Sequence, residues 1–199
     1  MIASKENFPT MTPEEYFAWE EQQLERHEYI EGKVYAMSGG TIDHGNIAGN
    51  FLALLKTDLR GSGCRTLNSD CRVSIVGSAK YVYPDISVTC EDRDRTTSQY
   101  ITYPCLIIEV LSPSTAAYDR GEKFENYRQI QSLQDYLLVA QDKMHIEYYT
   151  RQSDNTWVFV EFKHADDSFT LASIQCVLLL QEVYAKVILD QSSPVNGHA

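Results

Sequence analysis

The chain has 199 residues, of which 43% are hydrophobic and 23% are charged. This composition is typical of one globular domain with a sizeable core, and it excludes fibrous and largely disordered proteins. No apolar run reaches 18 residues, and the first residues lack the apolar segment of a secretion signal. We therefore expect a cytoplasmic protein without a membrane span.

The charge is distributed unevenly along the chain. There are 17 Lys and Arg residues against 28 Asp and Glu residues, which gives a formal net charge of -11. Such acidity disfavours a basic nucleic-acid-binding surface over the whole protein. Residues 56–128, however, hold ten basic and ten acidic residues. A local basic groove is therefore still compatible with the middle of the chain.

The cysteines are odd in number and form no CxxC pair. Three of them lie in apolar runs that are typical of strands. A disulfide framework or a structural zinc site is therefore disfavoured, and we expect reduced, buried thiols. The residues concerned are Cys64, Cys71, Cys90, Cys105 and Cys176.

The first half of the chain is expected to hold two helices and several short strands. Thr12 is the predicted N-cap of the first helix, with Pro13 at the first helical position. Asp43 is the predicted N-cap of the second helix, which has an apolar face and ends near Gly61. Strands are expected on both sides of a turn at Gly32, then at 64–67, 71–76 and 81–89, before a polar loop at 91–103.

The second half is expected to begin with a buried strand at 105–111, because that run is apolar on both alternating faces. A helix at 119–132 should follow, then strands near 136–140, 145–150, 156–162, 169–171 and 175–180 and a short helix near 181–187. This order predicts a mixed α/β or α+β domain over residues 12–188, with one sheet flanked by helices. Residues 1–11 and 189–199 are expected to be flexible ends.

Glu109 is the most informative residue of the sequence, because its neighbours on both faces of the predicted strand are apolar. A buried carboxylate is costly unless it is paired with a cation, a proton or a metal. Glu109 is therefore a candidate catalytic residue and metal ligand. The alternative is a glutamate at an exposed strand end that pairs with an arginine.

Asp85 is the natural companion of Glu109. Alternation along a strand places Tyr83, Asp85 and Ser87 on one face. Pro84 belongs at a strand start or a bulge, and such a position can aim the next side chain toward a site. The alternative interpretation of the Pro-Asp pair is an ordinary turn.

Lys123 is the third candidate. A helix that begins at Asp119 would place Asp119, Lys123 and Tyr127 on one face. The connection from the strand of Glu109 is short, so this face can lie against the end of that strand. The alternative is a surface pair of Asp119 and Lys123, worth a few tenths of a kcal/mol.

These three residues together form the arrangement of PD-(D/E)xK nucleases. Two carboxylates supply the oxygen ligands that Mg²⁺ or Mn²⁺ prefers, and such an ion polarises a phosphate and lowers the pKa of a bound water. A lysine ammonium orients that water or neutralises developing negative charge. The usual lysine lies two residues after the glutamate, where this chain has Leu111. Lys123 must then supply the charge from the helix.

Several short blocks of the sequence are distinctive. The most specific is Glu-Val-Leu-Ser-Pro-Ser-Thr at 109–115 with Asp-Arg-Gly-Glu-Lys at 119–123, and weaker ones are Glu-Tyr-Ile-Glu-Gly-Lys at 28–33, Met-Ser at 37–38, His-Gly at 44–45, Pro-Asp at 84–85 and Tyr127. Over about residues 12–188 these blocks resemble the Uma-two family of restriction-endonuclease-like proteins. The resemblance implies a restriction-endonuclease-like mixed sheet flanked by helices, with added C-terminal strands. It also implies a PD-(D/E)xK core with roles for Asp85, Glu109 and Lys123.

Accessory residues are expected around this core. Glu31, or with less support Glu28, could reach the same cation from the first pair of strands, and the alternative is a solvated turn carboxylate. His44 could contact phosphate or carry a proton, and the alternative is a hydrogen-bonding histidine at a helix start. Asp119 and Tyr127 are accessory candidates because they share the helix face of Lys123.

Two functions of different classes follow. The first is a Mg²⁺- or Mn²⁺-dependent endonuclease that hydrolyses DNA phosphodiester bonds. The second is a catalytically silent nucleic-acid-binding or assembly module on the same fold, which Leu111 and the overall acidity favour. We also expect a homodimer, because twofold pairing would let two sites address the two strands of a duplex.

Overall fold

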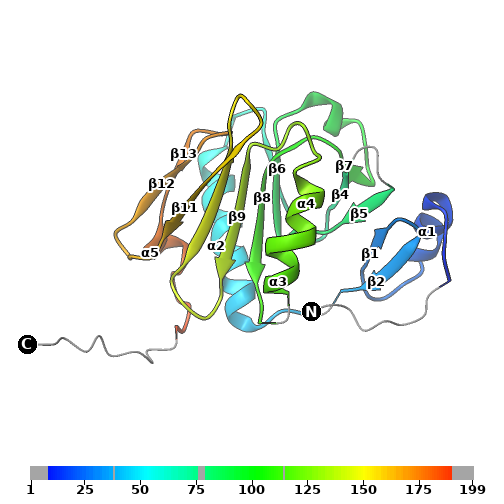
Figure 1. Cartoon of the computed structure of the whole chain (residues 1–199), viewed down its shortest axis with the longest axis horizontal. Helices are drawn as coiled ribbons and strands as arrows, with labels where there is room; N and C mark the ends of the chain where they lie inside the picture. Colours follow the sequence, from blue (N-terminus) through cyan, green and yellow to red (C-terminus); the bar gives the residue numbers. More distant parts are fainter. Residues whose placement is uncertain (1–8, 38, 76–78, 114, 190–199) are drawn as a thin grey trace, which may run out of the picture.

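The computed structural model describes residues 9–37, 39–75, 79–113 and 115–189. Its centre is a six-stranded sheet in the order β11-β10-β9-β8-β6-β3 (Figure 1). Only β8 and β9 run parallel, and the other neighbours are antiparallel. The strands span Arg65–Asn68 (β3), Ile86–Thr89 (β6), Pro104–Leu111 (β8), Asp135–Ala140 (β9), Ile146–Arg151 (β10) and Trp157–Phe162 (β11).

Two further sheets flank the central one. A five-stranded sheet has the order β2-β1-β5-β4-β7, with strands His27–Ile30 (β1), Lys33–Ala36 (β2), Arg72–Ile75 (β4), Lys80–Val82 (β5) and Tyr100–Ile101 (β7). A two-stranded sheet joins Ser168–Leu171 (β12) and Cys176–Leu179 (β13). The mixed α+β architecture is confirmed, but the strands are divided among three sheets where we expected one.

Helices cover both faces of the central sheet. Helix α2 (Ile42–Asp58) lies on one face, and the segment from α3 to α4 lies on the other (Figure 1). That segment comprises α3 (Ala116–Tyr118), a π-helical turn η2 (Asp119–Lys123) and α4 (Phe124–Tyr127), and it connects the parallel strands β8 and β9. The remaining helices are α1 (Pro13–Glu20), the 3₁₀ turn η1 (Asp92–Arg95) and α5 (Leu180–Val183).

The N-caps show how local sequence sets two helix starts. Thr12 caps α1 through a complete capping box with Glu15, as the sequence predicts. Helix α2 begins two residues earlier than expected, because the Thr41 hydroxyl accepts the His44 backbone N–H at 3.1 Å. Asp43 therefore lies in the first turn of α2 rather than at its cap.

Three expected segments differ from the observed ones. The strand expected at 81–89 is two strands in different sheets, because Pro84 has no N–H for a ladder and interrupts the pairing. The expected helix at 119–132 begins at Ala116 and ends at Tyr127, since the 112–116 turn already starts it. The loop expected at 91–103 contains η1 and β7, which the buried Asp94 organises by accepting the backbone N–H of Thr102 at 2.8 Å.

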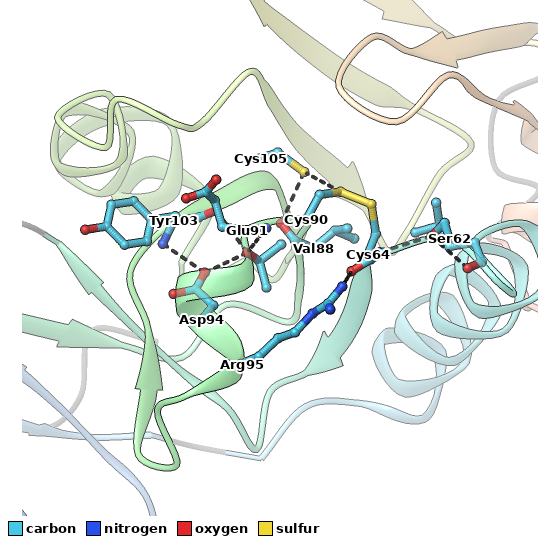
Figure 2. The surroundings of a disulfide bond; sticks show 12 residues. Ser62, Cys64, Val88, Cys90, Glu91, Asp94, Arg95, Tyr103 and Cys105 are labelled. Atoms are coloured by element: carbon cyan, nitrogen blue, oxygen red, sulfur yellow. Dashed lines mark hydrogen bonds between the residues drawn. A yellow bond between two sulfur atoms is a disulfide. The ribbon is translucent and has the colours of Figure 1, made fainter.

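The prediction of reduced thiols is wrong for two cysteines. Cys64 and Cys90 form a disulfide, with their Cα atoms 4.0 Å apart (Figure 2). The register of β3 and β6 pairs Arg65 with Thr89, so the next positions bring these two cysteines opposite each other. Cys71, Cys105 and Cys176 are free thiols. The bridge joins neighbouring strands that are distant in sequence, which is why cysteine spacing did not reveal it.

The expected flexible ends lie almost entirely outside the described residues. Met11, the last residue of the expected N-terminal end, is instead buried, and its backbone oxygen accepts the Tyr29 hydroxyl at 2.7 Å. Ser38 and Ser114, from two of the sequence blocks, also lie outside the description. Across the described parts of the chain, no helix has the length and apolar character to span a bilayer.

Candidate active site

Glu109 lies inside β8 on the face that the α3–α4 segment covers. The neighbouring positions on this face, Ile107 and Leu111, belong to an apolar cluster that includes Tyr127. The carboxylate is only 4% exposed, and its Oε1 accepts the Tyr127 hydroxyl at 2.7 Å and the Lys123 ammonium at 2.8 Å. Glu109 is therefore a buried carboxylate with two donors, and the alternative of an exposed strand end does not apply.

Asp85 immediately precedes β6, the antiparallel neighbour of β8. The register pairs Ile86 with Ile108, so Asp85 lies beside the Glu109–Val110 segment. The Val110 backbone N–H donates to Asp85 Oδ2 at 2.7 Å, and His44 Nε2 lies 3.0 Å from Oδ1. Strand β5 of the neighbouring sheet ends at Val82, and Pro84 interrupts the strand pairing just before Asp85. Its position explains why the next side chain points to a site rather than into a sheet.

Lys123 lies at the end of the π-helical turn, and only 8% of the residue is exposed. Its ammonium is 2.8 Å from Glu109, 3.7 Å from Asp119 and 3.7 Å from Glu28. The alternative of a solvent-facing lysine in a surface pair is therefore wrong. Such one-turn π segments occur frequently at functional sites.

The accessory carboxylates are placed differently from our first expectation. Glu28 lines the same cavity as Asp85 and Glu109, and its Oε1 accepts the Tyr83 backbone N–H at 3.3 Å. Glu31 is exposed and pairs with Lys80 at 3.2 Å, outside the cavity. Glu28 is therefore the better-placed candidate, because alternation along β1 turns it toward the site while Glu31 lies in the turn.

Asp85, Glu109 and Lys123 line a cavity of about 280 Å³ together with Glu28. Its charged lining consists of five carboxylates and one lysine, with His44 beside them. The carboxylates belong to Glu28, Asp85, Glu109, Asp119 and Glu122. Sequence reasoning missed Glu122, although it lies in the same block as Asp119 and Lys123, because the helical spacing pointed only to the 119–123–127 face.

The electrostatics of the cavity favour bound protons. Burial raises the pKa of Glu109 to about 8, and repulsion from Asp85 and Asp119 adds to this effect against the opposing charge of Lys123. Burial opposes the charge of Lys123, but the surrounding acidic groups, first Glu109, hold its pKa above the ordinary value. Burial also lowers the pKa of His44, yet its hydrogen bond to Asp85 and the negative charges of Asp85 and Asp119 together outweigh this and raise the pKa overall.

The donor set fits a hard divalent cation. Asp85 and Glu109 offer carboxylate oxygens, and the repulsion between them is the kind of penalty that a bound cation relieves. Within the described residues, no group of three or more His, Cys, Asp and Glu side chains is arranged to hold an ion. Mg²⁺ commonly keeps several waters and uses one or two protein carboxylates, so the two carboxylates satisfy its needs.

Comparison with known proteins identifies the family. The Uma2 family, described as "Putative restriction endonuclease", matches residues 13–180. Two proteins of Synechocystis sp. are similar along most of their length. The chain is 45% identical to uncharacterized protein slr1290 over 89% of this chain and 93% of that protein. It is 34% identical to uncharacterized protein sll1609 over 82% and 95%.

A solved structure shares the fold. It is the crystal structure of a "putative nuclease belonging to DUF820" from Anabaena variabilis, with a TM-score of 0.73. The match covers 89% of this chain and 99% of that one at 17% sequence identity. The nuclease-like fold is therefore shown, with its mixed sheet flanked by helices. Because the family match and both relatives extend over most of the sequence, the chain belongs to the Uma2 family of restriction-endonuclease-like proteins.

Proposed function

We propose that the protein is a Mg²⁺- or Mn²⁺-dependent endonuclease that hydrolyses DNA phosphodiester bonds. One observation carries the proposal. The buried Glu109 carboxylate lines one cavity with Asp85, and the Lys123 ammonium is 2.8 Å from Glu109. The family and the fold support the same class of function.

In this proposal Asp85 and Glu109 hold the cation. When bound, the ion polarises the scissile phosphate and acidifies a water. The Tyr127 hydroxyl and the Val110 N–H fix the two carboxylates through hydrogen bonds of 2.7 Å each. Lys123 keeps its proton and presents positive charge where negative charge develops on the phosphate. His44 holds Asp85 Oδ1 and can carry a proton at the edge of the site.

The second candidate is a catalytically silent binding or assembly module. Leu111 at the position of the usual lysine and the five carboxylates of the cavity favour it. The buried position of Glu109 favours the nuclease instead, because a silent module gains nothing from the desolvation cost of a carboxylate.

The deciding experiment combines calorimetry with a cleavage assay. Wild type and Asp85→Ala are titrated with Mg²⁺ and with Mn²⁺, and both are incubated with single-stranded DNA and with plasmid DNA. Asp166→Ala, which removes an exposed carboxylate outside the cavity, is the matched control. We expect cation binding and cleavage in wild type and control, and neither in Asp85→Ala. Cation binding without cleavage of either DNA would support the silent module.

We further propose that the protein acts in the cytoplasm as a homodimer. Twofold pairing is the commonest oligomer symmetry and would place two sites on one duplex. Light scattering at micromolar concentration tests the assembly, with an expected mass of twice 22.7 kDa. A mass of 22.7 kDa would contradict the dimer.

A further inference from the structure

The cavity is lined by aromatic side chains as well as by carboxylates. Tyr35, Tyr83 and Tyr118 all contribute to its wall, and Tyr35 and Tyr118 are half-buried. Tyr35 on β2 pairs in register with Glu28 on β1, so both belong to the strand hairpin on one side of the site. Tyr118 comes from the opposite element, one residue before Asp119 in the α3–η2 segment. The carboxylates that would hold the cation therefore share the cavity with aromatic rings from two separate elements.

The size and charge of this cavity do not suit an intact duplex. A volume of about 280 Å³ is at the lower end for small-molecule sites, and it suits a single base rather than a stacked pair. Duplex binding relies on many Lys and Arg contacts to phosphates. Lys123 is the one Lys or Arg side chain among the described lining residues, and it already contacts Glu109.

A basic hollow lies next to the cavity. Its lining includes Lys80, Arg120 and Arg128 beside Glu125 and Glu122, the last of which it shares with the cavity. Lys80 pairs with Glu31 at 3.2 Å, and the Arg120 guanidinium donates to Glu147 at 2.9 Å. The Arg128 side chain is exposed and lies over the Phe124 ring, with its guanidinium carbon 5.1 Å from the ring centre. All three basic residues belong to the charge-balanced middle of the chain. Arg128 is therefore the lining cation that the hollow offers to a phosphate.

We propose that the site takes a single DNA strand, with one base stacked on Tyr35 and Tyr118 and the adjoining phosphate at Arg128 in the basic hollow. The inference rests on the proposed function, since it names the substrate class of the same site. Aromatic stacking accepts any base, and a short basic surface is enough for a strand that makes few phosphate contacts. The two features together favour a flexible strand over a rigid duplex.

The test measures binding separately from cleavage. A fluorescent ten-nucleotide single strand and the duplex of the same sequence are titrated with wild-type protein in Ca²⁺, which takes the same oxygen ligands. Fluorescence anisotropy gives both dissociation constants. We expect the single strand to bind at least about 10-fold more tightly at physiological salt. Equal or tighter binding of the duplex would overturn the proposal.

Variants assign the binding to the named surfaces. Tyr35→Ala and Tyr118→Ala should weaken single-strand binding by about 10- to 100-fold, whereas Tyr35→Phe should bind like wild type. Arg128→Gln should reduce the salt dependence, with a slope smaller by about 0.7. Tyr103→Ala is the control, because Tyr103 stacks on Arg93 away from the cavity. Unchanged binding in folded Tyr35→Ala, checked by circular dichroism, would refute the stacking role.

Failure of this inference is distinct from failure of the proposed function. Tyrosine-dependent binding of single strands without cleavage in Mg²⁺ or Mn²⁺ would end the nuclease proposal and keep the single-strand site. Cleavage of duplex faster than single strand, lost in Asp85→Ala, would keep the nuclease and reject the single-strand site.

Discussion

The two faces of strand β8 are built from different chemistry. On one face Leu106, Ile108 and Val110 belong to an entirely apolar cluster with helix α2. On the other face Glu109 interrupts the apolar pattern and meets Lys123 on the segment that follows the strand. One strand can therefore contribute both to the stability of the fold and to a functional site. The α2 face stabilises the fold, and the opposite face can bear the desolvation cost of a site.

The largest expected effect comes from removing the positive charge on the Glu109 face of β8. Lys123→Met should lower the rate of metal-dependent cleavage by about 10²- to 10³-fold, because it removes the positive charge next to the reacting phosphate. Metal affinity should change much less, since a lysine is not a metal ligand. Lys123→Arg should restore only part of the rate, because a planar guanidinium cannot replace a compact ammonium.

Initial rates and calorimetric metal titrations measure the two effects of Lys123→Met separately. Lys143→Met, at an exposed position outside the cavity, is the matched control and should keep the wild-type rate. An unchanged rate in Lys123→Met would remove Lys123 from the proposed chemistry.

The next prediction compares the two faces directly by stability. Ile108→Ala should lower the free energy of unfolding by about 3 kcal/mol, because it leaves a cavity in the apolar cluster against α2. At pH 7 Glu109→Gln should change it by less than about 1 kcal/mol, since a carboxyl with a pKa of about 8 is mostly neutral there, as the amide is. Urea denaturation of the metal-free proteins measures both. A larger loss in Glu109→Gln than in Ile108→Ala would contradict this division of roles.

A third prediction separates stability from the site. In the Cys64–Cys90 bridge (Figure 2), Cys90 follows the last residue of β6. Asp85 precedes the first residue of the same strand. It closes a loop with a sequence separation of 26 residues, so its loss should cost about 3 kcal/mol of stability. Cys64→Ser with Cys90→Ser tests this by thermal unfolding, and Cys71→Ser is the control.

Metal affinity of the double cysteine variant should equal that of wild type, because the bridge does not line the cavity. A weaker affinity would show that the bridge helps to position Asp85. A thiol assay that finds five free thiols in the native protein would show that the bridge is absent.

The smallest expected effect is the pH dependence of metal affinity. The pKa of Glu109 is raised to about 8 by burial first, and a cation requires the deprotonated carboxylate. Binding below pH 8 must therefore release a proton, so affinity should rise about tenfold per pH unit from pH 6 to 8 and then level off. Calorimetry in buffers of different ionisation enthalpy counts the released protons.

His44 is the competing source of such a proton, since its pKa is also raised by Asp85 against the lowering effect of burial. His44→Gln should keep the same slope if Glu109 is the group that titrates. A slope that disappears in His44→Gln would assign the proton to the histidine instead.

Local sequence predicted much of the fold. The capping box at Thr12, the turn at Gly32 and the apolar run that became β8 all depend on neighbouring residues, and each is present. Sheet membership was not predictable in this way. The run through Pro84 looks like one strand, yet β5 and β6 pair with different partners, and those partners come from distant parts of the chain.

The candidate site was likewise predictable only in part from the local sequence. Asp85, Glu109 and Lys123 were found from burial cost, alternation and helical spacing, and the structure brings them to one cavity. The preference for Glu31 over Glu28 had no local basis, because the side chain that reaches the cavity depends on how the hairpin lies against β8. The neighbouring positions of Cys64 and Cys90 likewise depend on the pairing of β3 with β6.

The sequence by itself therefore determined which side chains would be costly to bury and which short segments fold locally. An apolar run, and a carboxylate that lies within it, can be recognised from residues that are adjacent in the sequence. Only the tertiary structure decided which strands pair, which cysteines meet and which carboxylates share the cavity with Lys123. These contacts join residues that are far apart along the chain, and strand register with helix packing determines their distances.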